Sequence, residues 1–126
     1  MDLFGKLKKK KMLLIDDDEW IRDSLCLFFE GEGCRLTALE TAEEGLEALK
    51  EENYDVIIVD YKLPGMDGLE FLRLIQENDH QPVKILITAY GTEEVASKAT
   101  GMGIQDFIAK PFTSKIIEKS LSRLIR

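Results

Sequence analysis

Short apolar runs alternate along this chain with segments whose apolar residues recur at helical spacing. Three of the runs, at residues 12–15, 56–59 and 83–87, are almost continuously apolar. Continuous apolar runs of this length are typical of strands covered by helices on both faces of a sheet. The pattern predicts five strands: Met12–Ile15, Cys34–Leu39, Val56–Val59, Val83–Ile87 and Gln105–Ala109.

The segments that follow these strands predict five helices, because their apolar residues lie three and four positions apart. The second helix begins with a capping box formed by Thr41 and Glu44. The fourth begins at Gly91 or Thr92. The five apolar faces are predicted to contain Ile21, Leu25 and Phe28; Leu46 and Leu49; Leu69, Leu72 and Ile75; Val95, Ala96 and Ala99; and Ile117, Leu121 and Leu124.

Alternating strands and helices predict an α/β fold, since right-handed crossovers place helices on both faces of a parallel sheet. Five strands in roughly 110 residues suit a flavodoxin-like, doubly wound sheet with strand order 2-1-3-4-5. The chain has 126 residues, of which 44% are hydrophobic and 33% charged, and this is enough for one domain with its own core. We therefore expect a basic N-terminal tail, residues 1–10, and one folded domain, residues 11–126.

Charge is distributed unevenly along the chain. Residues 1–11 carry five lysines and one aspartate, a net charge of +4, whereas residues 12–126 carry 12 Lys or Arg and 23 Asp or Glu, a net charge of −11. An acidic domain argues against direct binding of nucleic acid. We expect the basic segment to be a frayed, solvated tail. An arm that binds a membrane surface or a partner is the alternative.

The cysteines, the single histidine and the short apolar runs exclude several kinds of metal site and membrane segment. Cys26 and Cys34 match no metal-ligand spacing, so reduced thiols in a cytoplasmic protein are expected. His80 is the only histidine, which excludes a histidine metal cluster. The longest uncharged apolar runs are four or five residues, so neither a transmembrane span nor a signal-peptide core is predicted.

Aspartates follow the first and third predicted strands. Asp16 and Asp17 come directly after the first strand, and Asp60 comes directly after the third. In an open α/β sheet, ligands bind beyond the carboxyl ends of the strands, at the switch point between strands 1 and 3. The predicted strand order therefore brings the three aspartates together, and Thr88 and Lys110 converge on them from the neighbouring strands.

This group of residues suits phosphoryl chemistry. Three close carboxylates repel one another, and a hard divalent cation, Mg²⁺ or Mn²⁺, relieves the repulsion. The backbone carbonyl of Lys62 is a further candidate ligand. Asp60 can attack phosphorus and form an aspartyl-phosphate. The transferred phosphoryl group then needs a metal, a hydroxyl and an ammonium, which Asp17, Thr88 and Lys110 would provide.

The motifs LLIDDDEWIR, VIIVDYKLPGMDGLEFL, ILITAYG and DFIAKPF resemble those of the receiver domain of two-component response regulators. The resemblance covers roughly residues 11–125, with all the motifs in order. It implies that Asp60 is the phosphoryl acceptor, that Asp17 ligates Mg²⁺ directly and that Asp16 does so through water. It also implies a switch hydroxyl at Thr88 and a phosphate-pairing lysine at Lys110.

The same resemblance assigns the remaining roles. Phe107 would be the switch aromatic, and Pro111 would follow a cis peptide bond. Lys62 and Tyr90 occupy positions that tune the lifetime of the acyl phosphate in the family. Because both side chains are bulky enough to crowd out the attacking water, we expect a moderately long-lived phosphate. Acidic Asp18 and Glu19 favour the start of the first helix and are not counted as ligands.

A receiver domain implies a sensor histidine kinase, or a histidine phosphotransfer protein, as the phosphoryl donor. Phosphorylation adds about −1.5 to −2 charge. The added charge would shift the face made by the fourth helix, the fifth strand and the last helix, for partner binding or homodimerisation. The domain would catalyse only its own phosphorylation and dephosphorylation. We favour a stand-alone regulator, with a fragment of a longer protein as the alternative.

Two other function classes fit the residues less well. A Mg²⁺-dependent phosphohydrolase with an aspartate nucleophile is the enzyme alternative. Haloacid-dehalogenase-like enzymes need a second acid two residues after the nucleophile, and Lys62 stands there instead. A flavodoxin-like cofactor carrier would need a phosphate-binding loop after the first strand, where this chain has aspartates that would repel the phosphate of FMN.

Overall fold

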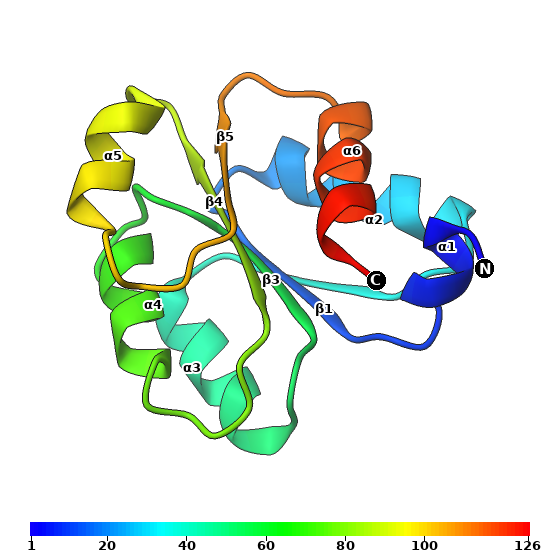
Figure 1. Ribbon diagram of the computed structural model, residues 1–126, viewed down its shortest axis with the longest axis horizontal. Helices are drawn as coiled ribbons and strands as arrows, with labels where there is room; N and C mark the ends of the chain where they lie inside the picture. Colours follow the sequence, from blue (N-terminus) through cyan, green and yellow to red (C-terminus); the bar gives the residue numbers. More distant parts are fainter.

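The computed structural model describes all 126 residues and shows a parallel sheet between two layers of helices (Figure 1). Its five strands lie in the order β2-β1-β3-β4-β5, and every neighbouring pair is parallel. The predicted fold class and strand order are therefore confirmed. The strands are β1 (Met12–Ile15), β2 (Leu36–Leu39), β3 (Val56–Asp60), β4 (Val83–Thr88) and β5 (Asp106–Ala109).

Helices cover both faces of the sheet (Figure 1). Side chains of α1, α2 and α6 pack on one face, and those of α3, α4 and α5 pack on the other. None of these helices combines the length and the apolar run that a membrane crossing requires. The helices are α1 (Leu3–Leu7), α2 (Glu19–Gly31), α3 (Ala42–Glu51), α4 (Gly68–Ile75), α5 (Thr92–Lys98) and α6 (Ser114–Leu124).

Alternation along the strands divides the core into two apolar clusters. Met12 and Leu14 pack in the cluster beneath α2 and α6, whereas Leu13 and Ile15 pack in the cluster beneath α3 and α4. Successive side chains of a strand point to opposite faces of the sheet, so an apolar run without polar interruptions serves both clusters. This explains why β1 is apolar at every position and β3 at every position but its last.

Helix α1 is a sixth helix where five helices and a frayed N-terminal tail were expected. The side chain of Asp2 caps it by accepting a hydrogen bond from the amide of Gly5, at 2.8 Å. Leu7 is fully buried, and the ring of Phe4 meets that of Phe28 edge-on, with centroids 6.0 Å apart. The apolar side of this short segment therefore closes the cluster beneath α2, a gain that outweighs the weak helix propensity of a five-residue stretch.

The element boundaries differ from the prediction by one or two residues. Strand β2 begins two residues later than predicted, because the amide of Cys34 donates to the carbonyl of Phe29 in α2, at 2.9 Å, and not to a neighbouring strand. Strands β3 and β4 each extend by one residue, to include Asp60 and Thr88. The predicted capping box at the start of α3 is confirmed.

Candidate functional site

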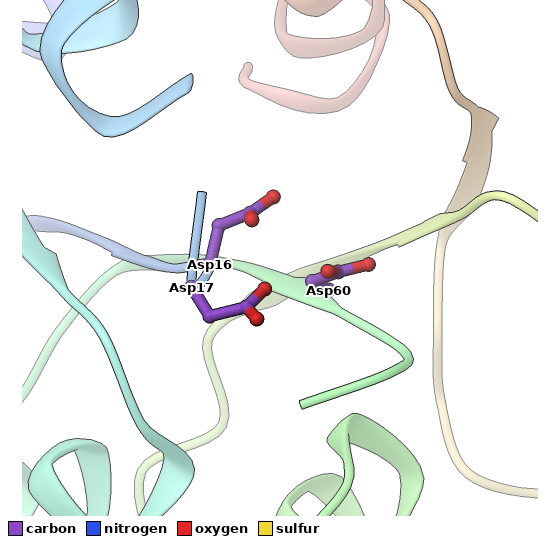
Figure 2. Close-up of side chains that lie close together, drawn as sticks. All are labelled: Asp16, Asp17 and Asp60. Atoms are coloured by element: carbon purple, nitrogen blue, oxygen red, sulfur yellow. The ribbon is translucent and has the colours of Figure 1, made fainter. Parts of the chain in front are cut away.

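Parallel pairing brings the carboxyl ends of β1 and β3 together. Ile15 pairs with Val59, so Asp16 and Asp60 emerge side by side, and Asp17 lies one residue further on. Oxygens from the three carboxylates all lie within 4.8 Å of one another (Figure 2). Asp16 is fully buried and Asp60 is 4% exposed, whereas Asp17 is exposed. The result is an acidic pocket, Asp16, Asp17 and Asp60, which opens to solvent on the Asp17 side.

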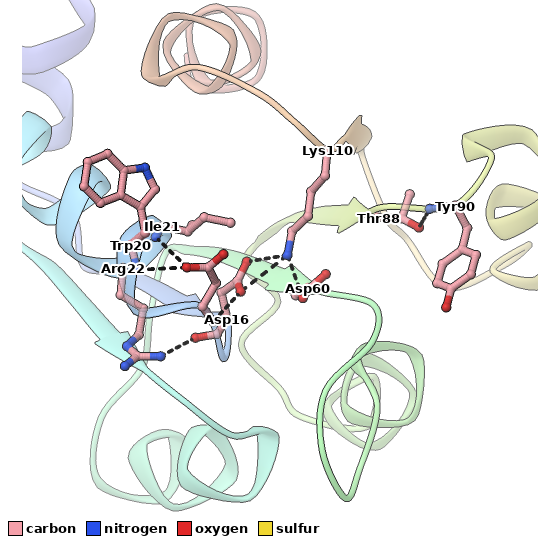
Figure 3. A network of polar contacts seen from close by, with 9 residues as sticks. Asp16, Trp20, Ile21, Arg22, Asp60, Thr88, Tyr90 and Lys110 are labelled. Atoms are coloured by element: carbon pink, nitrogen blue, oxygen red, sulfur yellow. Dashed lines mark hydrogen bonds and ion pairs between the residues drawn. The ribbon is translucent and has the colours of Figure 1, made fainter.

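Lys110 enters this pocket from the loop after β5 (Figure 3). Its Nζ lies 3.0 Å from Oδ2 of Asp60 and 3.2 Å from Oδ2 of Asp16. The peptide bond between Lys110 and Pro111 is cis. Burial lowers the pKa of Lys110, but the hydrogen bond and the negative charges of Asp60 and Asp16 outweigh it and raise the pKa. The ammonium group is therefore a permanent positive charge in the pocket.

The buried carboxyl groups ionise with difficulty. Burial raises the pKa of Asp60 to about 6, with a contribution from the negative charge of Asp16, although the hydrogen bond from Lys110 opposes the shift. Burial also raises the pKa of Asp16, against the hydrogen bond that it accepts from the backbone amide of Asp18. When all three carboxylates are ionised, one ammonium group leaves two negative charges without a counter-charge.

Oδ2 of Asp16 is the second sign of an incomplete site. It is buried and lies near Lys110, yet it has no hydrogen-bond partner. Its one charged contact is the ion pair with Lys110, so this buried oxygen can still accept a bond from a cation or from water. Two excess negative charges and an all-oxygen donor set fit a hard divalent cation. The residues present are therefore suited to hold Mg²⁺.

The neighbouring acidic residues have other roles. Oδ1 of Asp18 accepts hydrogen bonds from the amides of Trp20 and Ile21, at 2.9 and 3.4 Å, and so caps α2. This agrees with its interpretation as a helix-start residue rather than a ligand. Arg22 donates to the backbone carbonyl of Asp16, at 2.9 Å, and holds the end of β1 in place (Figure 3).

Thr88 lies at the end of β4 and is fully buried. Its Oγ1 accepts a hydrogen bond from the backbone amide of Tyr90, at 2.9 Å (Figure 3). The hydroxyl is thus engaged by its own loop and makes no hydrogen bond to Asp60. Phe107 lies in β5, half-buried, and packs against the cluster beneath α3, α4 and α5. The structure therefore brings Asp60 and Lys110 into contact. Thr88 and Phe107 lie on the neighbouring strands β4 and β5 and do not contact Asp60 through a hydrogen bond.

Lys62 and Tyr90 are linked by the ring of Tyr61, a residue for which no role was predicted from the sequence. The ring of Tyr61 packs edge-on against that of Tyr90, with centroids 6.0 Å apart. Nζ of Lys62 lies 5.8 Å from both ring centroids, within cation–π range. The three side chains link the loop after β3 to the loop after β4. Tyr61 directly follows Asp60 in the sequence, and an aromatic residue at that position could have indicated a contact beside the pocket.

Arg22 and Glu43 were also missed. Both act on backbone atoms outside their own helix, Arg22 on the carbonyl six residues earlier, and no local motif marks such contacts. Glu43 accepts a hydrogen bond from the amide of Met66, which lies 23 residues further along the chain.

Comparison with known proteins agrees with this site. The response regulator receiver domain family matches residues 12–122. The chain is 37% identical over 120 residues to the uncharacterized transcriptional regulatory protein YkoG of Bacillus subtilis, covering 94% of this chain and 50% of that protein. It is 34% identical over 116 residues to the transcriptional regulatory protein ResD of the same organism, covering 92% and 48%. The chain thus spans about half the length of the curated relatives it matches.

Solved structures give the same result. The beryllofluoride-activated NtrC4 receiver domain dimer is 33% identical, with a TM-score of 0.81, and the match covers 90% of this chain and 93% of that one. The chemotaxis response regulator CheY4 of Vibrio cholerae has a TM-score of 0.85 at 24% identity, covering 92% and 98%, and supports the fold alone.

An open parallel sheet with a buried acidic pocket and a lysine at its carboxyl edge defines a phosphoacceptor module. This chain belongs to the response regulator receiver domain family. It is a signalling phosphoacceptor of two-component systems, as its resemblance implied, and carries the acidic pocket and Lys110 of that class.

The raised pKa of Asp60 predicts that replacing it stabilises the metal-free protein. Between pH 4 and pH 6 the folded protein holds a proton on Asp60 that the unfolded chain, with its ordinary pKa of 3.8, has released. Stability is therefore lost as the pH rises through this range. At pH 7.5 the free energy of unfolding of Asp60→Asn should be about 1–3 kcal/mol higher than that of wild type. Near pH 4 the two proteins should have the same free energy of unfolding.

Urea unfolding at both pH values, with EDTA present, measures this difference. Asp79→Asn removes an exposed carboxylate and should behave like wild type at each pH. Equal stability of wild type and Asp60→Asn at pH 7.5 would show that ionised Asp60 is not strained by its surroundings.

Proposed function

We propose that Asp60 accepts a phosphoryl group from the phosphohistidine of a sensor histidine kinase or a histidine phosphotransfer protein. The observation that carries this proposal is the nearly buried Asp60 carboxylate, 3.0 Å from Lys110 and beside two further aspartates. A carboxylate oxygen of Asp60 attacks phosphorus, the P–N bond of the donor breaks, and its electron pair returns to the imidazole nitrogen. The product is an acyl phosphate on Asp60.

Asp16, Asp17, Asp60 and the backbone carbonyl of Lys62 would hold Mg²⁺, or Mn²⁺ in its place. Support comes from Oδ2 of Asp16, which has an ion-pair contact but no hydrogen bond, and from the two excess negative charges of the pocket. When bound, the cation neutralises charge that develops on the phosphoryl oxygens. Lys110 supplies a second positive charge at the same place, since it already donates a hydrogen bond to Asp60.

Thr88 and Phe107 would convert phosphorylation into a change of surface. The hydroxyl of Thr88 turns from the loop toward the new phosphoryl oxygens and donates a hydrogen bond to them, which gives up the bond from the Tyr90 amide. The loop after β4 then shifts, and Phe107 rotates into the vacated space. Phe107 also lines a surface pocket of about 400 Å³ beside α6, so its rotation reshapes the face made by α5, β5 and α6.

Lys62 and Tyr90 would set the lifetime of the acyl phosphate. Their contact through the ring of Tyr61 supports this role, because it holds bulky side chains together next to the residue that is phosphorylated. Water that approaches Asp60 from the side of the loops after β3 and β4 would meet this cluster. We therefore expect a moderately long-lived phosphate, and a half-life of seconds would contradict that expectation.

Partners follow from the surfaces around the site. Trp20 is 78% exposed and lines a pocket of about 230 Å³ with Phe112, next to the acidic pocket, and this surface is available to the donor. The related NtrC4 receiver domain forms a beryllofluoride-activated dimer, which supports homodimerisation of this chain on phosphorylation. Two relatives about twice as long as this chain are named transcriptional regulatory proteins, so control of transcription is also proposed as the output. The two free cysteines fit a cytoplasmic location.

Acetyl phosphate and Mg²⁺ should add one phosphoryl group to the wild-type protein. Intact mass and mobility on a phosphate-affinity gel detect the adduct, which should be absent from Asp60→Asn and from samples with EDTA. Asp79→Asn should be phosphorylated like wild type. An adduct that survives in Asp60→Asn would place the acceptor elsewhere, and turnover of p-nitrophenyl phosphate would favour a phosphohydrolase.

Thr88→Ala should accept the phosphoryl group yet lose the response of the α5–β5–α6 face, because no hydroxyl is left to follow the phosphoryl oxygens. Amide chemical shifts of α5, β5 and α6, with and without phosphorylation, measure the response. Thr88→Ser retains a hydroxyl and should respond, as should Thr100→Ala, whose hydroxyl bonds only within its own turn. A wild-type response in Thr88→Ala would remove Thr88 from the switch.

Tyr90→Ala should shorten the acyl-phosphate lifetime, since it opens the cluster beside Asp60 to water. We expect dephosphorylation to be about two- to tenfold faster, measured as the decay of the phosphorylated fraction after the donor is removed. Tyr90→Phe keeps the ring against Tyr61 and should decay like wild type. Equal decay of all three proteins would show that the cluster does not control access of water.

A further inference from the structure

The loop between β3 and α4, residues 61–67, contains Lys62, whose backbone carbonyl is a proposed Mg²⁺ ligand. Its far end is held tightly against β3. The amide of Gly68 donates to the carbonyl of Tyr61, at 2.8 Å, and a Cβ at position 68 would collide with the carbonyl oxygen of Asp60. The middle of the loop has no backbone hydrogen bond to the sheet. It is anchored by the buried side chain of Leu63, and further contacts come from side chains of other elements.

Glu43 provides such a contact from a different element. It is the second residue of α3, and its Oε2 accepts a hydrogen bond from the backbone amide of Met66, at 3.2 Å. At the preceding position, a Cβ would lie only 2.7 Å from the same oxygen. Gly65 also has a φ of +75°, which other residues rarely adopt. The glycine therefore serves two purposes: it allows the turn and lets the carboxylate reach the loop.

The start of α3 leaves this carboxylate free for the loop. Glu44, not Glu43, completes the capping box, since its Oε1 accepts hydrogen bonds from the amides of Thr41 and Glu40, at 3.1 and 3.3 Å. The capped helix start is a rigid base, and Glu43 projects from it across to residues 65–66. Two adjacent glutamates thus have separate tasks, one within the helix and one between elements.

We propose that Glu43 is a positioning residue that holds the 61–67 loop so that the Lys62 carbonyl is presented to Mg²⁺. This inference rests on the proposed function, in which Lys62 is a ligand. Glu43 touches neither the acidic pocket nor the phosphoryl group. Its effect passes through the loop, as residues around a metal site commonly act by orienting the ligands.

Three variants separate this role from a simple effect of charge. Glu43→Ala removes both the charge and the hydrogen-bond acceptor. Glu43→Gln removes the charge but keeps an oxygen that can accept from Met66. Glu47→Ala removes the same charge one turn further along α3, where the carboxylate pairs only with exposed Lys50. Each variant retains the Thr41–Glu44 capping box, so α3 should fold in all of them.

Hydrogen exchange of the Met66 amide, measured by NMR without metal, tests the first step. Glu43→Ala should exchange about two- to tenfold faster at this amide than wild type, the range that one exposed hydrogen bond permits. Glu43→Gln and Glu47→Ala should exchange like wild type. Equal exchange in Glu43→Ala would show that the contact does not hold the loop.

Mg²⁺ titration of the same four proteins, followed through their amide chemical shifts, tests the second step. The Kd of Glu43→Ala for Mg²⁺ should rise about two- to tenfold, whereas Glu43→Gln and Glu47→Ala should stay within about twofold of wild type. A loss in Glu43→Gln as large as that in Glu43→Ala would overturn the proposal in favour of charge. Identical Kd values in all four proteins would overturn the inference alone, and a wild type that binds no Mg²⁺ would overturn the proposed metal site as well.

Discussion

The structure is organised around the burial of negative charge at one edge of a parallel sheet. Register between β1 and β3 forces Asp16 and Asp60 together where water is largely excluded, and the sheet cannot relieve the repulsion by moving one strand. Lys110 offsets part of the charge, and the pKa of Asp60 still rises to about 6. A site with two uncompensated negative charges favours the binding of a cation, and its carboxylate can form a bond to an electrophilic group.

The parallel topology of the sheet explains the arrangement of the loops around this charge. The loops after β1, β3, β4 and β5 all leave the sheet at the same edge, so each can place one group near Asp60 without altering the core. Asp17, the 61–67 loop, Thr88 and Lys110 arrive in this way. Most of the stability resides in the two apolar clusters on either side of the sheet, and the buried charge of the pocket lowers it.

Side-chain contacts connect the loop after β3 to the loop after β4 and to α3. The rings of Tyr61 and Tyr90 join the loop that follows the acceptor to the loop that follows Thr88, and Lys62 lies against both rings. Glu43 ties the first of these loops to α3. In the proposed function, a phosphoryl group on Asp60 would act on two loops that already contact each other.

The sequence by itself determined the fold class, the strand order and the members of the pocket. Apolar runs mark β1, β3 and β4, and the polar residue that ends each run falls at the carboxyl edge by the geometry of parallel strands. Only the tertiary structure decided that α1 docks against Phe28, that the Thr88 hydroxyl accepts from the Tyr90 amide, and that Glu43 reaches Met66. These contacts join residues through rotamers and loop paths that no local periodicity encodes, because they arise when separate elements pack together.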